Sequence, residues 1–284
     1  MLLTVALACA AAVLAVPASA DAATLRKAKP AWLTSALQKK ISAAGPDGVQ
    51  IPADTLNTAC PGFQGAGVSA AGCIVAPYGC TANFIFTDGS SFYVGTAGHC
   101  SNQVGDTVTM QVDTITIADV GTVVKRTPHP AGDGIPGSDF SLIRIDPAVQ
   151  ARWGLNPAVP VVGGPNGVYT GCGPEAVLHY GHGYAAAMAQ GKPSAGLATN
   201  WFDNAYGWTG FGLPGDSGSP VVTATGQAAG NFTHLIVNTG VPGSNLAGMR
   251  APSILRFAGV SLLNADGSVT SGPTSVSCGQ DPPF

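Results

Sequence analysis

The sequence predicts an all-β fold made of antiparallel strands, and three observations support this. From Cys60 onward, short runs rich in β-branched and aromatic residues alternate with turns, and the 284 residues include 39 Gly and 22 Pro. The runs follow one another closely, without the regular alternation of strand and helix that a parallel sheet requires. The dipeptide Asp88-Gly89 between two runs is typical of a hairpin turn. An antiparallel sandwich or barrel is therefore favoured over a parallel α/β sheet.

Each expected element is a run with the matching periodicity. The expected strands are 83–87, 91–96, 107–112, 120–124, 140–145, 221–223 and 235–238. Two segments have a helical pattern. One covers 32–41 and has Lys39 and Lys40 in its last turn, where a helix dipole favours cations, and the other covers 253–257.

The chain is long enough for one domain of roughly 200–250 residues together with processed segments. Residues 1–20 are apolar, contain no charged side chain and end in Ala18-Ser19-Ala20, which predicts a secretory signal peptide. Pro17 and the small residues at the end argue against a membrane anchor. Residues 21–59 are an N-terminal extension or a pro-segment, and the sequence does not decide between them. Residues 60–284 form the main domain.

The charge pattern excludes some partners. Charged residues make up only 10% of the chain, against about 25% in an average globular protein, and the net charge is −3. This gives no electrostatic reason to bind nucleic acid or an anionic membrane. We therefore expect no nucleic-acid partner and no stable association with a membrane. The chain is further expected to be a secreted, extracellular monomer with no cofactor.

Cysteine usage also indicates export. Six cysteines remain after the signal peptide, which predicts three disulfides with fifteen possible pairings: Cys60, Cys73, Cys80, Cys100, Cys172 and Cys278. The spacing closest to a metal pair is His179 and His182, in a Gly-rich segment. Zinc sites take three or four ligands, and no second pair accompanies these histidines, so we expect no metal site.

Three segments contain residues suited to nucleophilic catalysis. They are Thr96-Ala-Gly-His99-Cys, Ser138-Asp139 at the start of a strand, and Gly215-Asp-Ser217-Gly. Serine is a weak nucleophile that needs a base, and the base needs a third group to hold its tautomer. His99, Asp139 and Ser217 suit these roles, in the order His, Asp, Ser. Asp133 is the rival acid, but it lies in a turn where Asp is expected for local hydrogen bonding.

Two further features would support such a site. If Cys100 pairs with Cys80, the bond closes a loop of about 20 residues, stabilises by roughly 3 kcal/mol and fixes the base; we expect this pair. Gly215 permits a backbone conformation in which its N–H and the N–H of Ser217 face the same point. Together they would form an oxyanion hole.

The three segments resemble the His, Asp and Ser signatures of the chymotrypsin-like (trypsin-fold) serine peptidases, especially their secreted bacterial branch. The resemblance covers about residues 73–260. It implies two antiparallel six-stranded β-barrels with the active-site cleft between them. It also implies endopeptidase activity through a Ser217 acyl-enzyme, with a protein or peptide as substrate.

The resemblance also suggests substrate-binding residues: Phe211, Gly212, Asn238, Thr239 and Gly240. Phe211 stands where trypsins have Asp, so a tryptic preference is not expected and small or hydrophobic side chains are favoured. Arg250 could instead read an acidic substrate side chain or pair with Asp216.

The chain departs from the family pattern at two positions. Ser219 stands where Gly is usual, and Asn238 where Ser is usual. These departures keep open the alternative of a non-catalytic protein that binds a ligand or partner at the cleft. A narrow esterase is a further alternative, because an acylating serine does not distinguish an ester from an amide. An α/β-hydrolase is disfavoured because His precedes Ser and strands do not alternate with helices.

Overall fold

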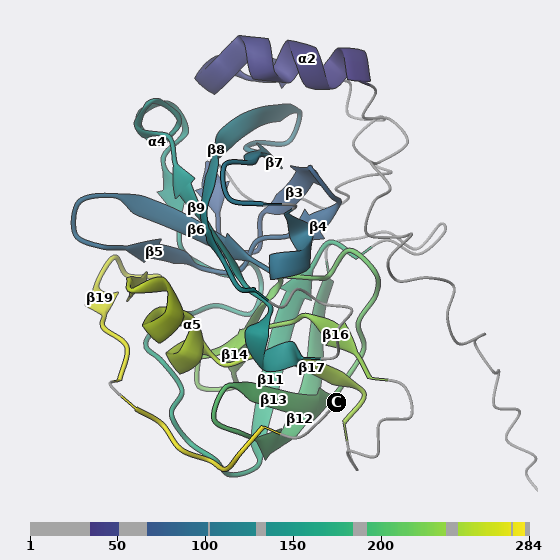
Figure 1. Cartoon of the computed structure of the whole chain (residues 1–284), viewed down its shortest axis with the longest axis vertical. Coiled ribbons are helices and arrows are strands. Elements are labelled where there is room, and N and C mark those ends of the chain that lie inside the picture. Colours follow the sequence, from purple (N-terminus) through teal and green to yellow (C-terminus); the bar gives the residue numbers. More distant parts are fainter. Residues whose placement is uncertain are drawn as a thin grey trace, which may run out of the picture.

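The computed structural model describes residues 35–50, 67–101, 103–128, 135–183, 192–236, 244–273 and 275–281. Most of their regular structure is β, in two large sheets that lie one above the other in Figure 1. The α-helices of these residues are α2 (Ser35–Ala44), α4 (Pro147–Trp153) and α5 (Ala251–Ala258). The expected helix at 253–257 lies inside α5. The one expected at 32–41 overlaps α2, and residues 32–34 lie outside the described part.

The first sheet follows the order β19-β18-β5-β6-β9-β8-β7-β3-β4, and β1 pairs with β8 off this path. Its strands are β1 (Val49–Gln50), β3 (Cys73–Ala76), β4 (Cys80–Thr81), β5 (Ile85–Thr87), β6 (Phe92–Thr96), β7 (Thr107–Gln111), β8 (Thr116–Arg126), β9 (Ser141–Ile145), β18 (Ser261–Leu263) and β19 (Val269–Thr270). The turn between β5 and β6 forms because the Asp88 carboxylate accepts the N–H groups of Ser90 and Ser91 and the hydroxyl of Tyr93.

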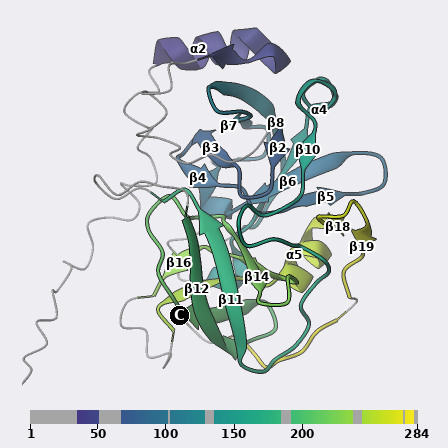
Figure 2. The same ribbon diagram turned by 180° about the vertical axis from the view of Figure 1, so that it is seen from behind.

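The second sheet has seven antiparallel strands in the order β15-β14-β11-β12-β13-β17-β16. They are β11 (Glu175–Gly181), β12 (Lys192–Trp201), β13 (Ala205–Thr209), β14 (Pro220–Thr223), β15 (Ala228–Asn231), β16 (His234–Leu235) and β17 (Leu246–Met249). The view from behind in Figure 2 shows the long pair β11 and β12. Two short strands, β2 (Val68–Ser69) and β10 (Leu155–Asn156), form a separate parallel pair.

Each sheet has its own core, and a third core joins them. Ile85, Met110 and Ile143 belong to the first core, and stacked Trp201, Tyr206 and Trp208 to the second. The joining core combines residues of both sheets and of α5: Phe84, Phe86, Phe140, Tyr180, Met249 and Ile254. Burying one large apolar side chain contributes about 1.5–3 kcal/mol. The shared core therefore fixes how the two sheets meet.

The described residues also contain three 3₁₀ turns: η1 (Gly45–Asp47), η2 (Gly98–Cys100) and η3 (Pro136–Ser138). Turn η2 follows β6, and η3 precedes β9 and packs against β13 and β17 of the second sheet. The loop between β13 and β14 also crosses to the first sheet, because the Thr81 N–H donates to the Ser217 carbonyl at 2.9 Å. His99, Asp139 and Ser217 are therefore carried to the junction of the sheets.

The mostly β, antiparallel character predicted from the sequence is confirmed, but the two six-stranded barrels are not. The described residues form sheets of ten and seven strands. The first sheet gains strands because the two-residue β1 joins β8, the C-terminal strand β18 pairs with β5, and β19 pairs with β18. These additions are short, and none has the alternating run that marks a strand in sequence.

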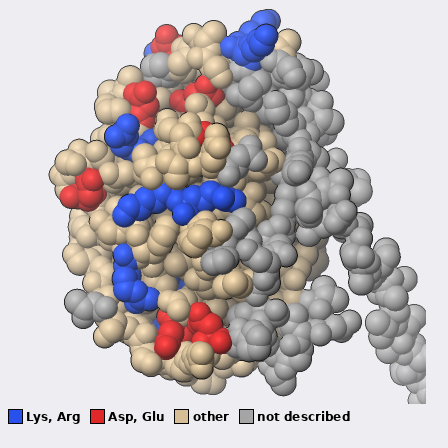
Figure 3. Space-filling view, viewed as in Figure 1, with Lys and Arg blue, Asp and Glu red and all other residues tan. Residues whose placement is uncertain are grey.

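The segment of residues 35–50 lies against the first sheet. It is held there by the pairing of β1 with β8 and by an ion pair between Asp47 and Arg152 at 2.9 Å. The proposed signal peptide at 1–20 lies outside the described residues. In the part of the chain that is described, no helix combines the length and apolar character needed to cross a membrane. The face in Figure 3 is mostly uncharged, with Lys, Arg, Asp and Glu in small groups of both signs.

Candidate active site

His99 lies in η2, directly after β6, on a backbone that is held from two sides. The Arg126 Nε donates to the Gly98 carbonyl at 2.9 Å, and Cys100 forms a disulfide with Cys80 across 20 residues. This is the cysteine pair that the sequence favoured. A closed loop of this length stabilises by about 3 kcal/mol. The imidazole therefore projects from a fixed turn, and 8% of the His99 side chain is exposed.

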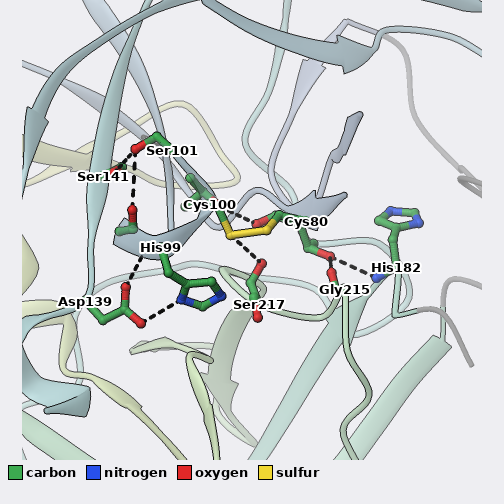
Figure 4. The surroundings of a disulfide bond; sticks show 12 residues. Cys80, His99, Cys100, Ser101, Asp139, Ser141, His182, Gly215 and Ser217 are labelled. Carbon is green, nitrogen blue, oxygen red and sulfur yellow. Dashed lines mark hydrogen bonds and ion pairs between the residues drawn. A yellow bond between two sulfur atoms is a disulfide. The ribbon is translucent and has the colours of Figure 1, made fainter. Parts of the chain in front are cut away.

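The Asp139 carboxylate binds both the backbone and the ring of His99. Its Oδ1 accepts the His99 main-chain N–H at 2.9 Å, and its Oδ2 lies 2.8 Å from Nδ1 (Figure 4). The Asp139 carbonyl in turn accepts the Asn231 Nδ2 from the second sheet at 3.1 Å. A carboxylate at Nδ1 holds the ring proton there and leaves Nε2 as the acceptor, as a general base requires.

Burial and hydrogen bonding act in opposite directions on Asp139. Its side chain is completely buried, which raises the pKa, but the charge and hydrogen bonds of His99 outweigh this effect. The pKa of Asp139 is therefore lowered from its ordinary value of 3.8. The group is ionised at neutral pH and can stabilise a protonated His99.

A second histidine faces the same carboxylate. The His234 Nδ1 lies 3.9 Å from Asp139 Oδ2 and 2.7 Å from the Thr233 hydroxyl oxygen. His234 begins strand β16, and its charge also lowers the pKa of Asp139. The sequence interpretation missed this residue, since no motif surrounds it and only the pairing of β16 with β17 brings it to the acid.

Ser217 lies on the turn between β13 and β14, pressed against the first sheet. Its carbonyl accepts the Thr81 N–H at 2.9 Å and lies 3.7 Å from Cys100 Sγ. Gly218 has a φ of +92°, and a Cβ there would lie 2.2 Å from the Thr81 carbonyl oxygen. Only glycine allows so close an approach. Figure 4 shows Ser217 beside the His99 ring and below the disulfide.

The Ser217 side chain is half-buried and close to His99, but the structure shows no hydrogen bond between the two. Such bonds are often long before substrate binds and tighten in the complex. The N–H groups of Gly215 and Ser217 also donate to none of the described residues. Gly215 has a φ of +98°, a conformation that glycine adopts without strain.

Comparisons with known proteins identify the fold. No sequence-family model matches the chain, and no curated protein matches it by sequence. Among solved structures, Protease A of Thermobifida fusca is 20% identical, with a TM-score of 0.50 over 69% of this chain and 98% of that one. A glutamic acid specific serine protease, described as using a novel histidine triad in substrate binding, is 18% identical with a TM-score of 0.48 over 69% and 100%. The alpha-lytic protease homolog N4 is 17% identical with a TM-score of 0.48 over 69% and 98%.

The chain has the chymotrypsin-like serine protease fold. This conclusion rests on the likeness to Protease A and on the mostly β architecture described above. At 20% identity it concerns the fold alone. The roles of the side chains depend on their own geometry.

Within this protease fold, the partners of Asp216 are now defined. The Asp216 Oδ1 accepts the Gly183 N–H at 2.6 Å, and its Oδ2 accepts the Leu213 N–H at 2.8 Å. Burial raises the pKa of Asp216, and His179 together with the two N–H groups opposes this only in part. The carboxylate thus ties the turn before Ser217 to the segment after β11.

Both suggested roles of Arg250 are wrong. Arg250 is completely buried, and its guanidinium donates to the carbonyls of Phe202 and Gly171 and to the sulfur of Cys278. It therefore neither reaches a substrate nor pairs with Asp216. Cys278 forms a disulfide with Cys172, a pairing that the sequence left open. Cys73 is disulfide-bonded as well, and Cys60 lies outside the described residues.

The expected substrate-binding residues are described only in part. Phe211 is 61% exposed, and its carbonyl lies 2.7 Å from His179 Nε2, while Gly212 is half-buried beside the Phe232 ring. Asn238, Thr239 and Gly240 lie outside the described residues. The unusual Ser219 is fully buried, with its hydroxyl 3.4 Å from His179 Nδ1.

The histidines at 179 and 182 do not converge as metal ligands would. Each ring binds a different carbonyl oxygen, that of Phe211 for His179 and that of Ala71 for His182. In the described part of the chain, the grouping with ligand-like proximity is Cys80, His99 and Cys100. Both of its sulfurs are in a disulfide, so they have no thiolate to offer a metal.

Proposed function

We propose that this chain is a serine endopeptidase that hydrolyses peptide bonds through an acyl-enzyme on Ser217. The observation that carries the proposal is the fully buried Asp139 carboxylate bound to His99 Nδ1 next to the Gly-Asp-Ser-Gly turn. In a fold shared with serine proteases, this arrangement provides a base with a fixed tautomer beside a half-exposed serine.

The reaction follows from the roles of these groups. The Ser217 Oγ attacks the scissile carbonyl while His99 Nε2 takes its proton, and Asp139 stabilises the resulting imidazolium. The N–H groups of Gly215 and Ser217 receive the developing oxyanion, and one such donor is worth about 10²–10³ in turnover. His99 then protonates the departing amine. A water molecule, activated by the same imidazole, hydrolyses the acyl-enzyme.

We also propose that the substrate side chain beside the scissile bond is small or hydrophobic. The exposed Phe211 offers apolar surface before Ser217, and Leu235 on β16 is 48% exposed. The buried Arg250 is not available to read an acidic group. Asn238, Thr239 and Gly240 are proposed to bind the substrate backbone.

The remaining assignments concern processing and location. We propose that residues 1–20 direct secretion, that 21–59 are an extension or pro-segment, and that the mature enzyme is an extracellular monomer. Disulfides across 20 and 106 residues suit an oxidising compartment. The low content of charged side chains favours neither nucleic acid nor an anionic membrane as partner.

A serine-directed phosphonate tests the proposal. The purified protein should be labelled on Ser217 and should cleave casein, whereas Ser217→Ala should lose both properties while keeping its melting temperature. Ser90→Ala, which removes an exposed hairpin serine, is the control and should be labelled fully. A folded protein without label would favour the non-catalytic alternative. Turnover of nitrophenyl esters without cleavage of casein would favour the narrow esterase.

A further inference from the structure

Thr81 connects the first sheet to the turn that carries Ser217, and it uses each of its polar atoms at this junction. It is completely buried in β4, next to Cys80. Its main-chain N–H donates to the Ser217 carbonyl at 2.9 Å, and its carbonyl accepts the Thr96 hydroxyl at 2.8 Å. The Thr81 hydroxyl donates to the Gly215 carbonyl at 2.9 Å.

The direction of the hydroxyl bond is fixed by a second partner. The His182 main-chain N–H donates to Thr81 Oγ1 at 2.9 Å, so the hydroxyl oxygen acts there as the acceptor. A carbonyl only accepts, so the hydroxyl hydrogen points at Gly215. Figure 4 shows Gly215 and His182 together on the side of the disulfide away from His99.

This bond restrains a peptide unit that glycine leaves free. Gly215 has no Cβ and a φ of +98°, so its own backbone preference does not fix the orientation of the neighbouring peptides. The peptide joining Gly215 to Asp216 is held at its carbonyl by Thr81 and at its N–H by the Leu213 carbonyl, 3.0 Å away. It lies between the two peptides that carry the N–H groups of Gly215 and Ser217.

We propose that Thr81 is a positioning residue for the oxyanion hole, an inference that rests on the proposed peptidase function. Its hydroxyl anchors the Gly215 carbonyl and so keeps the two N–H donors aimed at one point. The main-chain N–H of Thr81 binds the Ser217 carbonyl and so fixes how close the same turn lies to the first sheet. Removing the hydroxyl therefore weakens transition-state binding more than substrate binding.

The test compares Thr81→Val, which keeps shape and the main-chain N–H, with Thr81→Ser, which restores a hydroxyl. Direct loss of an oxyanion donor costs about 10²–10³ in turnover, so an indirect loss in Thr81→Val should lower kcat by roughly 10–100-fold with KM changed less than about threefold. A peptide aldehyde, whose adduct with Ser217 places an oxyanion at the site, should lose affinity by a similar factor. Thr81→Ser should stay within about threefold of the unsubstituted enzyme.

Thr109→Val is the matched control, because Thr109 is another fully buried threonine of the first sheet whose hydroxyl bonds to Asp119 at 2.6 Å. It should lower the melting temperature and leave kcat and aldehyde affinity unchanged. An active enzyme in which Thr81→Val retains full kcat overturns the positioning role alone. A folded chain that neither hydrolyses casein nor reacts with the phosphonate overturns the peptidase function and the positioning role together.

Discussion

The two halves of the candidate site are held in different ways. On the first sheet, the contact is between two side chains: the buried Asp139 carboxylate forms a charge-assisted hydrogen bond with the His99 ring. On the second sheet, the turn around Ser217 is held largely through its main chain, by the carbonyls of Gly215 and Ser217 and the N–H of Gly218. The first half therefore depends on residue identity, and the second on how closely two backbones approach.

The largest effect is expected from a substitution in the first half of the site, the His99–Asp139 pair. In Asp139→Asn, the amide nitrogen would take the place of Oδ2 and donate to His99 Nδ1, which forces the ring proton onto Nε2. A base in that tautomer cannot accept the proton of Ser217, so kcat should fall about 10³–10⁴-fold. Steady-state cleavage of a peptide substrate measures this.

Asp119→Asn is the control for that substitution, since Asp119 is also an acid of the first sheet but bonds to Thr109. It should keep kcat within a few-fold. A turnover for Asp139→Asn within tenfold of the unsubstituted protein would mean that another acid orients His99.

The second half of the site, the turn around Ser217, should be disrupted by a larger side chain and not by a change of charge. Gly218→Ala places a Cβ 2.2 Å from the Thr81 carbonyl oxygen and the Thr96 hydroxyl oxygen. Gly89 has the same φ of +92°, but a Cβ there meets nothing within 4 Å. Both variants share the backbone strain, so their difference isolates the contact. Gly218→Ala should be less stable than Gly89→Ala by about 1–3 kcal/mol in urea unfolding. Equal stabilities would show that the turn can move away from the first sheet.

A smaller effect is expected in the dependence of stability on pH at acid pH, where Asp139 becomes protonated. The pKa of Asp139 is lowered below 3.8 in the folded chain, so this group stabilises the fold above that value. The contribution is lost as pH falls from about 4 through the folded-state pKa. Melting temperatures of Ser217→Ala, which avoids self-digestion, should therefore drop more steeply below pH 4 than those of Ser217→Ala with Asp139→Asn. Parallel curves would contradict the lowered pKa.

The same contrast explains what could be predicted from the sequence. His99, Asp139 and Ser217 stand in short motifs whose residue types indicate nucleophilic catalysis. The Cys80–Cys100 pair was expected because Cys100 directly follows the base. Thr81, by contrast, becomes relevant only when β4 meets the turn at Ser217, which no local pattern encodes.

The differences between the structure and the sequence expectations have similar causes. The sequence allowed Arg250 to read an acidic substrate side chain or to pair with Asp216, yet the carbonyls of Phe202 and Gly171 satisfy it in the core. The strand numbers of the two sheets differ from two sets of six because two-residue strands form by pairing alone. Strands without their own pattern are fixed by their neighbours.

His234 gives the smallest expected effect and the finest test of the comparison, since it is a side chain of the second sheet acting on the acid of the first. A protonated His234 offsets part of the Asp139 charge across 3.9 Å and so competes with His99 for it. In His234→Asn the carboxylate acts on His99 alone, which favours the protonated, inactive base. The acid limb of the profile of kcat/KM against pH should therefore move to higher pH. Activity at pH 8 should change less than tenfold. A limb that stays in place or moves to lower pH would mean that His234 bears no charge against Asp139 during catalysis, and that the second sheet contributes to the acid only through its main chain and Asn231.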